Sequence, residues 1–277
     1  MTQITASQVN QLRKQTGAGM MDCKKALVET NGNIEQAIDV LRKKGQKIAA
    51  KRADREATEG VVLALTNASH NAGVIISLNC ETDFVAKNDS FVELAHTILT
   101  LALNSECADL DSVKGLSFDN NMSVNDKLVE QTGVIGEKIE LSNYSIIRGG
   151  YVGSYIHPGN KLASLVGFNN SFDGIEDLSK NIAMQIAAMN PLGIDESSVP
   201  QSIIDKEMEL GKDLARKEGK PEEMLDRIAQ GRLKKFFKEN TLLHQIYIKD
   251  SKLIVSAYLK TVNTDLSVTD FKRVQLG

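Results

Sequence analysis

Cysteine is scarce in this sequence. Only Cys23, Cys80 and Cys107 occur among 277 residues; they lie far apart, and none belongs to a Cys-x-x-Cys pair or has a histidine at ligand spacing. An odd number of widely spaced cysteines argues against a disulfide framework and against a zinc site. We therefore expect all three to be reduced residues that pack in the interior.

Long apolar runs are also missing. No stretch approaches the roughly 20 apolar residues that a membrane-spanning helix needs, and the 42% hydrophobic content is that of an ordinary globular protein. The first residues lack both the layout of a secretory signal and the Arg-rich composition of a transit peptide. We expect a cytoplasmic protein with no membrane role and, at 277 residues, more than one core.

The usual marks of catalysis are absent as well. We find no nucleophile paired with a base, no paired carboxylates in an apolar setting, no metal-ligand spacing and no complete phosphate-binding loop. Gly17 and Gly19 precede a helix but are interpreted as a turn. The four histidines are scattered, and only His157, in a turn at a strand end, is expected to meet a partner. The sequence therefore predicts a protein that is not an enzyme and uses no cofactor or metal.

Charge is distributed unevenly along the chain. Residues 1–58 hold 11 Lys and Arg against 6 Asp and Glu, whereas residues 59–200 hold 7 against 18. This difference indicates a domain boundary near residue 58. A basic N-terminal segment is compatible with nucleic-acid binding, but without an aromatic residue it is poorly suited to contact bases.

The N-terminal part reads as three short helices. Thr5 and Gln8 form a capping box before the first helix, a second helix spans about 20–30, and a third is capped by Asn33 and continues to Gly45. Residues 43–55, rich in Lys, Arg and Ala, are interpreted as a solvated helical linker. We assign residues 1–55 to a three-helix domain with its basic linker.

The middle of the chain contains an internal duplication. A strand, turn, strand, loop and helix occur over 61–104 and recur about ninety residues later, over 151–189. The pattern predicts an α+β fold whose two core subdomains each pack helix on antiparallel sheet. We assign 56–142 to the first subdomain, and 143–198 together with 241–262 to the second.

An insertion interrupts the second subdomain. Residues 199–240 have charged helical stretches on either side of a Gly219–Pro221 break, with sparse apolar positions typical of an antiparallel helical hairpin with a coiled-coil-like seam. Residues 245–248 and 253–259 are predicted to be strands that return to the second sheet. Residues 263–277 are assigned to a short C-terminal module.

The connector 79–88 is unusual because it places Phe84 and Val85 among polar residues. Large apolar side chains are rarely left in water without a reason. Two interpretations compete at this point. Phe84 either folds back as a plug over the following helix, or projects with Asp83 as a rigid wedge into another protein.

Two long motifs favour the second interpretation. The segments 16–27 (TGAGMMDCKKAL) and 80–87 (CETDFVAK) resemble the signatures of the elongation factor Ts family, and the similarity extends over nearly the whole chain, through the segment 231–236 to the closing FKRVQLG. The resemblance implies an N-terminal ubiquitin-associated-like three-helix domain, a two-part core and an inserted hairpin. It also implies a guanine-nucleotide exchange factor whose partner is elongation factor Tu, with no direct nucleic-acid contact.

The resemblance also assigns roles to individual residues. Thr82, Asp83, Phe84 and Val85 would enter the GTPase near its nucleotide site, where Phe84 would wedge between partner side chains and disturb the contacts to Mg²⁺ and phosphate. A second group would grip the partner elsewhere, and it consists of Arg13, Met20, Met21 and His157. From the residues alone, core filling is the competing interpretation for both methionines.

Several points remain open at this stage. Glu81, where relatives also carry Gln, is expected to face solvent, and the chain stops where many members continue into a further helix, so a contact through the C-terminal module is in doubt. Assembly of two complexes through the hairpin is an open alternative. A nucleic-acid-binding module and an enzyme hidden in the core are the competing functions.

Overall fold

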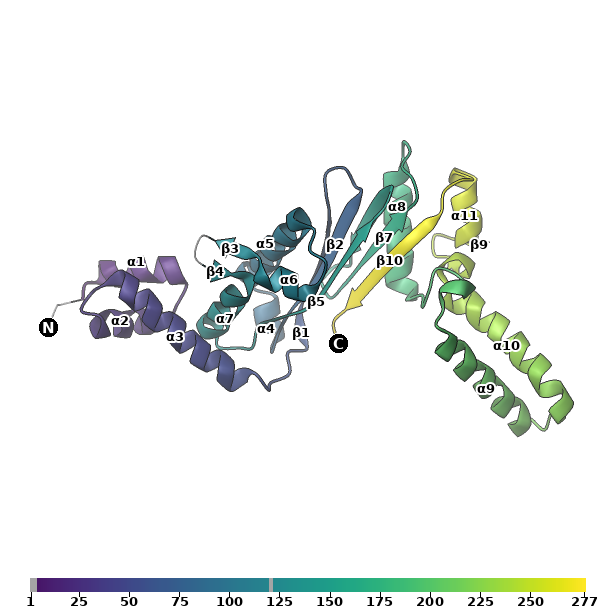
Figure 1. The fold of residues 1–277 in the computed structure, drawn as a ribbon, viewed down its shortest axis with the longest axis horizontal. Helices are drawn as coiled ribbons and strands as arrows, with labels where there is room; N and C mark the ends of the chain where they lie inside the picture. Colours follow the sequence, from purple (N-terminus) through teal and green to yellow (C-terminus); the bar gives the residue numbers. More distant parts are fainter. Residues whose placement is uncertain (1–3, 120–121) are drawn as a thin grey trace.

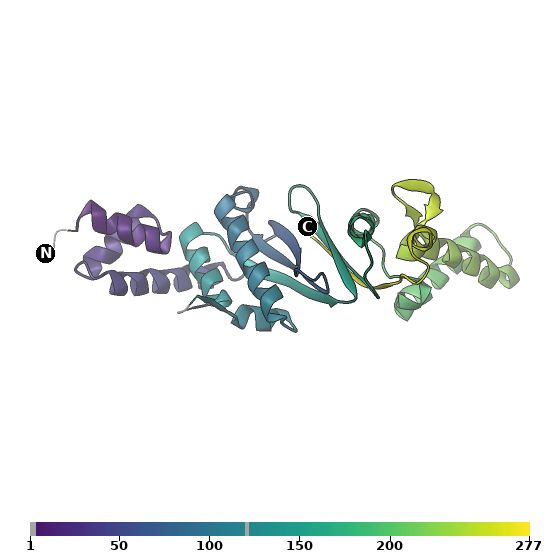
Figure 2. The same cartoon turned by 90° about the horizontal axis from the view of Figure 1, so that it is seen from above.

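The computed structural model describes residues 4–119 and 122–277. The molecule is elongated: a three-helix unit occupies one end, two small sheets with their helices form the middle, and a helical hairpin projects from the other end (Figures 1 and 2). The predicted α+β class is confirmed. Within the described residues, no helix is long and apolar enough to cross a membrane.

The N-terminal unit consists of α1 (Ala6–Thr16), α2 (Met20–Glu29) and α3 (Ile34–Arg52). The predicted capping box is present, since the Thr5 hydroxyl accepts from the Gln8 amide and the Gln8 side chain accepts from the Thr5 amide. The small core of the unit is apolar, and its buried members are Val9, Leu12, Ala18, Cys23, Ala26, Leu27 and Ala37.

The third helix does not end at Gly45 as predicted. It continues without interruption to Arg52, so residues 43–52 of the predicted helical linker are part of α3, and residues 53–55 follow the helix. Gly45 is buried against α7 (Val124–Ile135), and a Cβ added to Gly133 of that helix would collide with the Cα of Gly45. The absence of side chains at both positions lets the two helices cross at close range. The N-terminal unit is therefore packed on the core through α3.

The first sheet has the strand order β1 (Glu59–Thr66), β2 (Ala72–Cys80) and β5 (Glu140–Arg148), all antiparallel. One face is covered by α5 (Asp89–Ser105), whose predicted apolar stripe is buried. The subdomain boundary predicted at residue 142 is wrong, because β5 pairs with β2 along its whole length, from Glu140 to Arg148.

The second sheet has the order β10 (Val268–Gln275), β7 (Leu162–Phe168) and β6 (Tyr151–Ile156), with α8 (Ile175–Met189) on its outer face. Residues 263–277 therefore do not form a separate module: β10 pairs with β7 over most of its length. Leu266 and Val268, two residues apart in this segment, are buried in the core of this sheet.

The two sheets pack face to face. A separate apolar cluster fills the space between them, and its buried members are Val62, Ala64, Ile75, Ile147, Val152, Ala163 and Leu165. Since α5 and α8 cover the outer faces, the core has four layers in the order helix, sheet, sheet, helix. Every residue of β2 is buried, because this strand is covered on both faces.

The remaining elements complete both halves. Those of the first half are α4 (Asp83–Ala86), α6 (Leu110–Gly115), β3 (Ser117–Asp119) and β4 (Met122–Ser123). The hairpin consists of α9 (Gln201–Lys217) and α10 (Leu225–Asn240), flanked by the 3₁₀ turns η1 (Glu196–Ser198), η2 (Glu222–Met224) and η3 (Leu242–His244).

The structure after the hairpin differs from the prediction. The strands β8 (Ile246–Tyr247) and β9 (Asp250–Ile254) pair only with each other, and α11 (Val255–Val262) is a helix where a strand was predicted. Val255 and Leu259 lie four residues apart, and both are buried in the second core. In a helix, residues four apart lie on the same face, so α11 turns one side toward this core.

Candidate functional site

The connector after β2 forms a short exposed turn, residues 82–87, which we call the Phe84 turn. Phe84 lies in α4 and is 83% exposed, so the alternative in which it plugs the core is wrong. Its neighbours point the other way: Val85 packs against the first core and Ala86 is buried. A large aromatic side chain therefore projects into solvent from a turn whose other apolar residues hold it to the protein.

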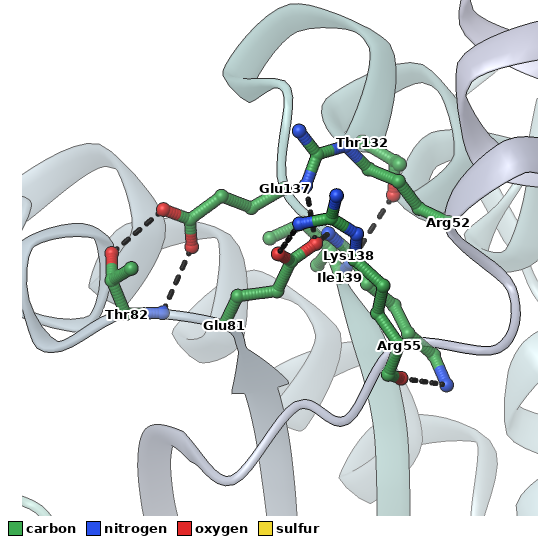
Figure 3. A network of polar contacts seen from close by, with 8 residues as sticks. All are labelled: Arg52, Arg55, Glu81, Thr82, Thr132, Glu137, Lys138 and Ile139. Atoms are coloured by element: carbon green, nitrogen blue, oxygen red, sulfur yellow. Dashed lines mark hydrogen bonds and ion pairs between the residues drawn. The ribbon is translucent and has the colours of Figure 1, made fainter.

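Thr82 fixes the start of the Phe84 turn. Its backbone N–H donates to Glu137 Oε2 at 3.0 Å and its hydroxyl donates to Glu137 Oε1 at 2.7 Å (Figure 3). Glu137 lies in the loop between α7 and β5. Because the Thr82 hydroxyl is engaged there, it does not cap α4. Two hydrogen bonds to one carboxylate therefore hold the start of the turn.

Glu81 is the centre of a second set of contacts, which we call the Glu81 cluster. Its carboxylate accepts from Arg52 Nη1 at 2.6 Å, from Arg55 Nη1 at 3.1 Å and from the Lys138 amide at 2.7 Å (Figure 3). Its side chain is only 14% exposed, so the expectation that Glu81 faces solvent is wrong. Burial raises the pKa of this carboxyl, but the hydrogen bonds from Lys138, Arg52 and Arg55 outweigh burial and lower the pKa to about 2.

Asp83 is more exposed and is held locally. Lys87, one helical turn further on, donates to its carboxylate at 2.6 Å, and this hydrogen bond lowers the pKa of Asp83. The charge of Lys161 acts in the same direction. Lys161 ends the turn that carries His157, so the two turns are electrostatically linked.

The His157 turn connects β6 to β7 and lies against β1. The Val62 amide donates to the Asn160 carbonyl at 2.6 Å, and Lys161 pairs with Glu59 at 2.8 Å. The His157 side chain is exposed, as predicted, with Nδ1 at 3.0 Å from the Tyr155 hydroxyl. The exposed imidazole lies on the second half of the core.

The other predicted contact residues lie on the three-helix unit. Met20 and Met21, at the start of α2, are 53% and 61% exposed, so the core-filling alternative is wrong for both. Arg13 is also exposed, in the last turn of α1. Figure 1 places α1 and α2 at the N-terminal end of the molecule, apart from α4. The structure thus groups residues 82–85 and leaves the N-terminal set as a separate exposed surface.

Sequence reasoning missed the residues that hold the Phe84 turn. Arg52 and Arg55 were counted only as linker charge, and neither Glu137 nor Lys138 was singled out. Arg52 lies 29 residues from Glu81 and Lys138 lies 57 residues away, so no local pattern joins them. The one available signal was a glutamate between a buried strand and an apolar turn, where an acidic side chain needs a partner.

Comparisons with known proteins agree with the two motifs. A family model described as "Elongation factor TS" matches residues 81–277. The chain is 57% identical over 278 residues to elongation factor Ts of Christiangramia forsetii and 53% identical over 278 residues to that of Flavobacterium psychrophilum, with 100% of each chain covered. It is 46% identical over 288 residues to elongation factor Ts of Chlorobium phaeobacteroides, again with 100% of both chains covered. The chain belongs to the elongation factor Ts family.

Proposed function

We propose that this protein is a guanine-nucleotide exchange factor that binds elongation factor Tu and promotes GDP release, so that GTP can bind during translation elongation in the cytoplasm. The observation that carries the proposal is the 83% exposure of Phe84 on a turn whose base is held by Glu137 and the Glu81 cluster. Membership of the elongation factor Ts family supports the identity of the partner.

Residues 82–85 of the Phe84 turn have different roles in this proposal. Phe84 and Asp83 enter the GTPase near its nucleotide site and disturb the contacts to Mg²⁺ and phosphate. Thr82 and Val85 hold the turn in place, since the first is bound to Glu137 and the second packs against the core. Displacing a divalent cation leaves the phosphate charge less compensated, so GDP dissociates faster.

The remaining residues supply affinity. Arg13, Met20 and Met21 contact the GTPase from the three-helix unit, and His157 contacts it from the second half of the core. Exposed methionines suit such a surface, because their flexible, polarisable side chains adapt to a partner. Exchange follows when the factor binds the nucleotide-free state more tightly than the GDP-bound state, and the coupling is reciprocal. No covalent bond is made or broken by this protein.

Release of labelled GDP from elongation factor Tu tests the proposal. Wild-type protein should accelerate release, and Phe84→Ala should reduce the acceleration by about tenfold or more, as expected for a central aromatic contact. Met224→Ala, which truncates a 46% exposed apolar residue at the hairpin tip, is the matched control and should accelerate GDP release as much as the wild type does. No acceleration by the wild type would refute the function, and full activity of Phe84→Ala would refute the role of Phe84.

A further inference from the structure

The exposed N-terminal surface and the Phe84 turn lie on different parts of the molecule, and Glu81 lies between them: it directly precedes the turn and is bound to the last residue of α3, Arg52. The two carboxylate oxygens of Glu81 accept from Arg52, the last residue of α3, and from Arg55, three residues beyond it. α3 is the helix that carries the three-helix unit, and its 19 residues span about 28 Å. A small change in the direction of α3 at its Arg52 end would displace Met20 and Met21, at the far end of the unit, by a larger distance.

A second contact restricts α3 part of the way along its length. At the Gly45–Gly133 crossing the helices α3 and α7 approach without intervening side chains. One crossing leaves a helix free to pivot about the contact, whereas two separated attachments define its direction. The Glu81 cluster is a separate attachment beyond the contact of the three-helix unit with α7, and it joins Arg52 of α3 directly to the residue before the Phe84 turn.

The cluster is also well placed to be stiff. Glu81 has a side chain only 14% exposed, Arg52 is 26% exposed, and the Lys138 amide supplies a backbone donor that does not move with any side-chain rotamer. Lys138 Nζ in turn donates to the Arg55 carbonyl at 3.1 Å, so Lys138 binds both Glu81 and the backbone of Arg55. Partly buried, multiply bonded ion pairs keep their geometry better than single surface pairs.

We propose that Glu81 is a positioning residue: through Arg52 and Arg55 it holds the three-helix unit at a fixed place relative to the Phe84 turn, so that both surfaces meet the GTPase in one binding event. This inference rests on the proposed exchange function. When two contact surfaces are rigidly linked, the second contact forms without a further loss of freedom, and apparent affinity rises although no contact is added.

The double variant Arg52→Gln with Arg55→Gln separates this role from that of the wedge. It removes the tie to α3 but leaves the Lys138 hydrogen bond to Glu81 and the Thr82 hydrogen bonds to Glu137 in place. The concentration for half-maximal GDP release should rise about tenfold, while the maximal rate should stay within about twofold, because Phe84 and its base are unchanged.

The matched control removes the same number of positive charges from nearby positions. Lys47→Gln with Lys51→Gln deletes two exposed lysines of α3, neither of which bonds to Glu81 among the described contacts. Its half-maximal concentration should move less than threefold. If both double variants shift equally, the effect is general electrostatic attraction and the positioning role is refuted; a fall in maximal rate without a shift in half-maximal concentration refutes it too.

A distance measurement in the free protein makes the inference independent of the exchange reaction. Spin labels on Gln11→Cys in α1 and Glu93→Cys in α5 occupy exposed positions, and the three native thiols are buried and should remain unlabelled. The distance distribution should broaden in the Arg52 and Arg55 double variant and stay narrow in the lysine control. An unchanged distribution overturns the proposal. If the wild-type protein does not accelerate GDP release from the GTPase, the proposed exchange function is refuted. The distance measurement then tests by itself whether the Glu81 cluster fixes the position of the three-helix unit.

Discussion

Three glycines in the middle of helices allow the close helix contacts to be tested by one type of substitution. A Cβ on Gly133 would collide with the Cα of Gly45 where α7 crosses α3. A Cβ on Gly211 of α9 would lie at 3.1 Å from both the Cα and the Cβ of Ala229, across the hairpin seam. A Cβ on Gly231 of α10 would have nothing within 4 Å. The same change, Gly to Ala, therefore meets three different environments.

The expected signs follow from two opposing contributions. Replacing a helix-interior glycine by alanine stabilises by about 0.5–1 kcal/mol, because alanine loses less backbone entropy on folding. Forcing an extra methyl into a close contact costs about 1–3 kcal/mol. We therefore expect Gly231→Ala to stabilise by about 0.5–1 kcal/mol, Gly211→Ala to be nearly neutral, and Gly133→Ala to destabilise by about 1–2 kcal/mol.

Urea unfolding followed by far-ultraviolet circular dichroism measures the three differences, since the chain has no tryptophan to report by fluorescence. A chain with several cores can unfold in more than one step, so amide hydrogen exchange should assign each change to its own helix pair. Equal stability of the Gly133→Ala and Gly231→Ala variants would refute the reasoning, because it would mean that α3 and α7 separate at no cost.

Three further predictions concern other parts of the structure. The folded-state pKa of Glu81 is about 2 and its ordinary value is 4.5, so its ionised form contributes roughly 3 kcal/mol of stability above pH 4.5. The difference in unfolding free energy between wild type and Glu81→Gln, measured by urea titration, should therefore shrink as pH falls from 4.5 to 2. A difference that stays constant with pH would contradict this. Thr82→Val removes a hydroxyl donor from the base of the Phe84 turn and should lower the maximal rate of GDP release about tenfold with little change in half-maximal concentration, the reverse of the arginine double variant. Assembly of complexes through the hairpin, left open above, predicts that Leu210→Glu with Leu214→Glu, at residues 49% and 37% exposed, shifts sedimentation of the complex toward one copy of each protein; unchanged sedimentation would rule out this contact.

Much of the fold followed from periodicity. Alternating and continuous apolar runs located β1, β2, β6 and β7, and apolar residues at helical spacing located α5 and α8, because each of these elements buries a regular set of side chains. The short apolar run over 253–259 was the failure. A run of this length is consistent with either a strand or a helix, and its local pattern does not distinguish the two; Val255 and Leu259 are buried in the second core as part of a helix.

The edge strands β5 and β10 could not be predicted from the local sequence pattern, for a different reason. β5 and β10 are mostly half-buried along their lengths, so neither shows the strong alternation of a central strand. Their place is fixed by pairing with β2 and β7, which lie far away in sequence. Pairing of this kind depends on tertiary contacts, and the sequence pattern of the strand itself carries little of it.

The site shows the same division between local and distant information. Phe84 could be singled out from its neighbours alone, because an aromatic residue in a polar connector is locally unusual. Whether it points inward or outward depends on tertiary contacts: Thr82 at the start of the turn is bound to Glu137, and Val85 and Ala86 pack into the first core. Because Val85 and Ala86 take the inward side of the short helix α4, Phe84 lies on its outward side, and such an arrangement cannot be read from residues 79–88 alone.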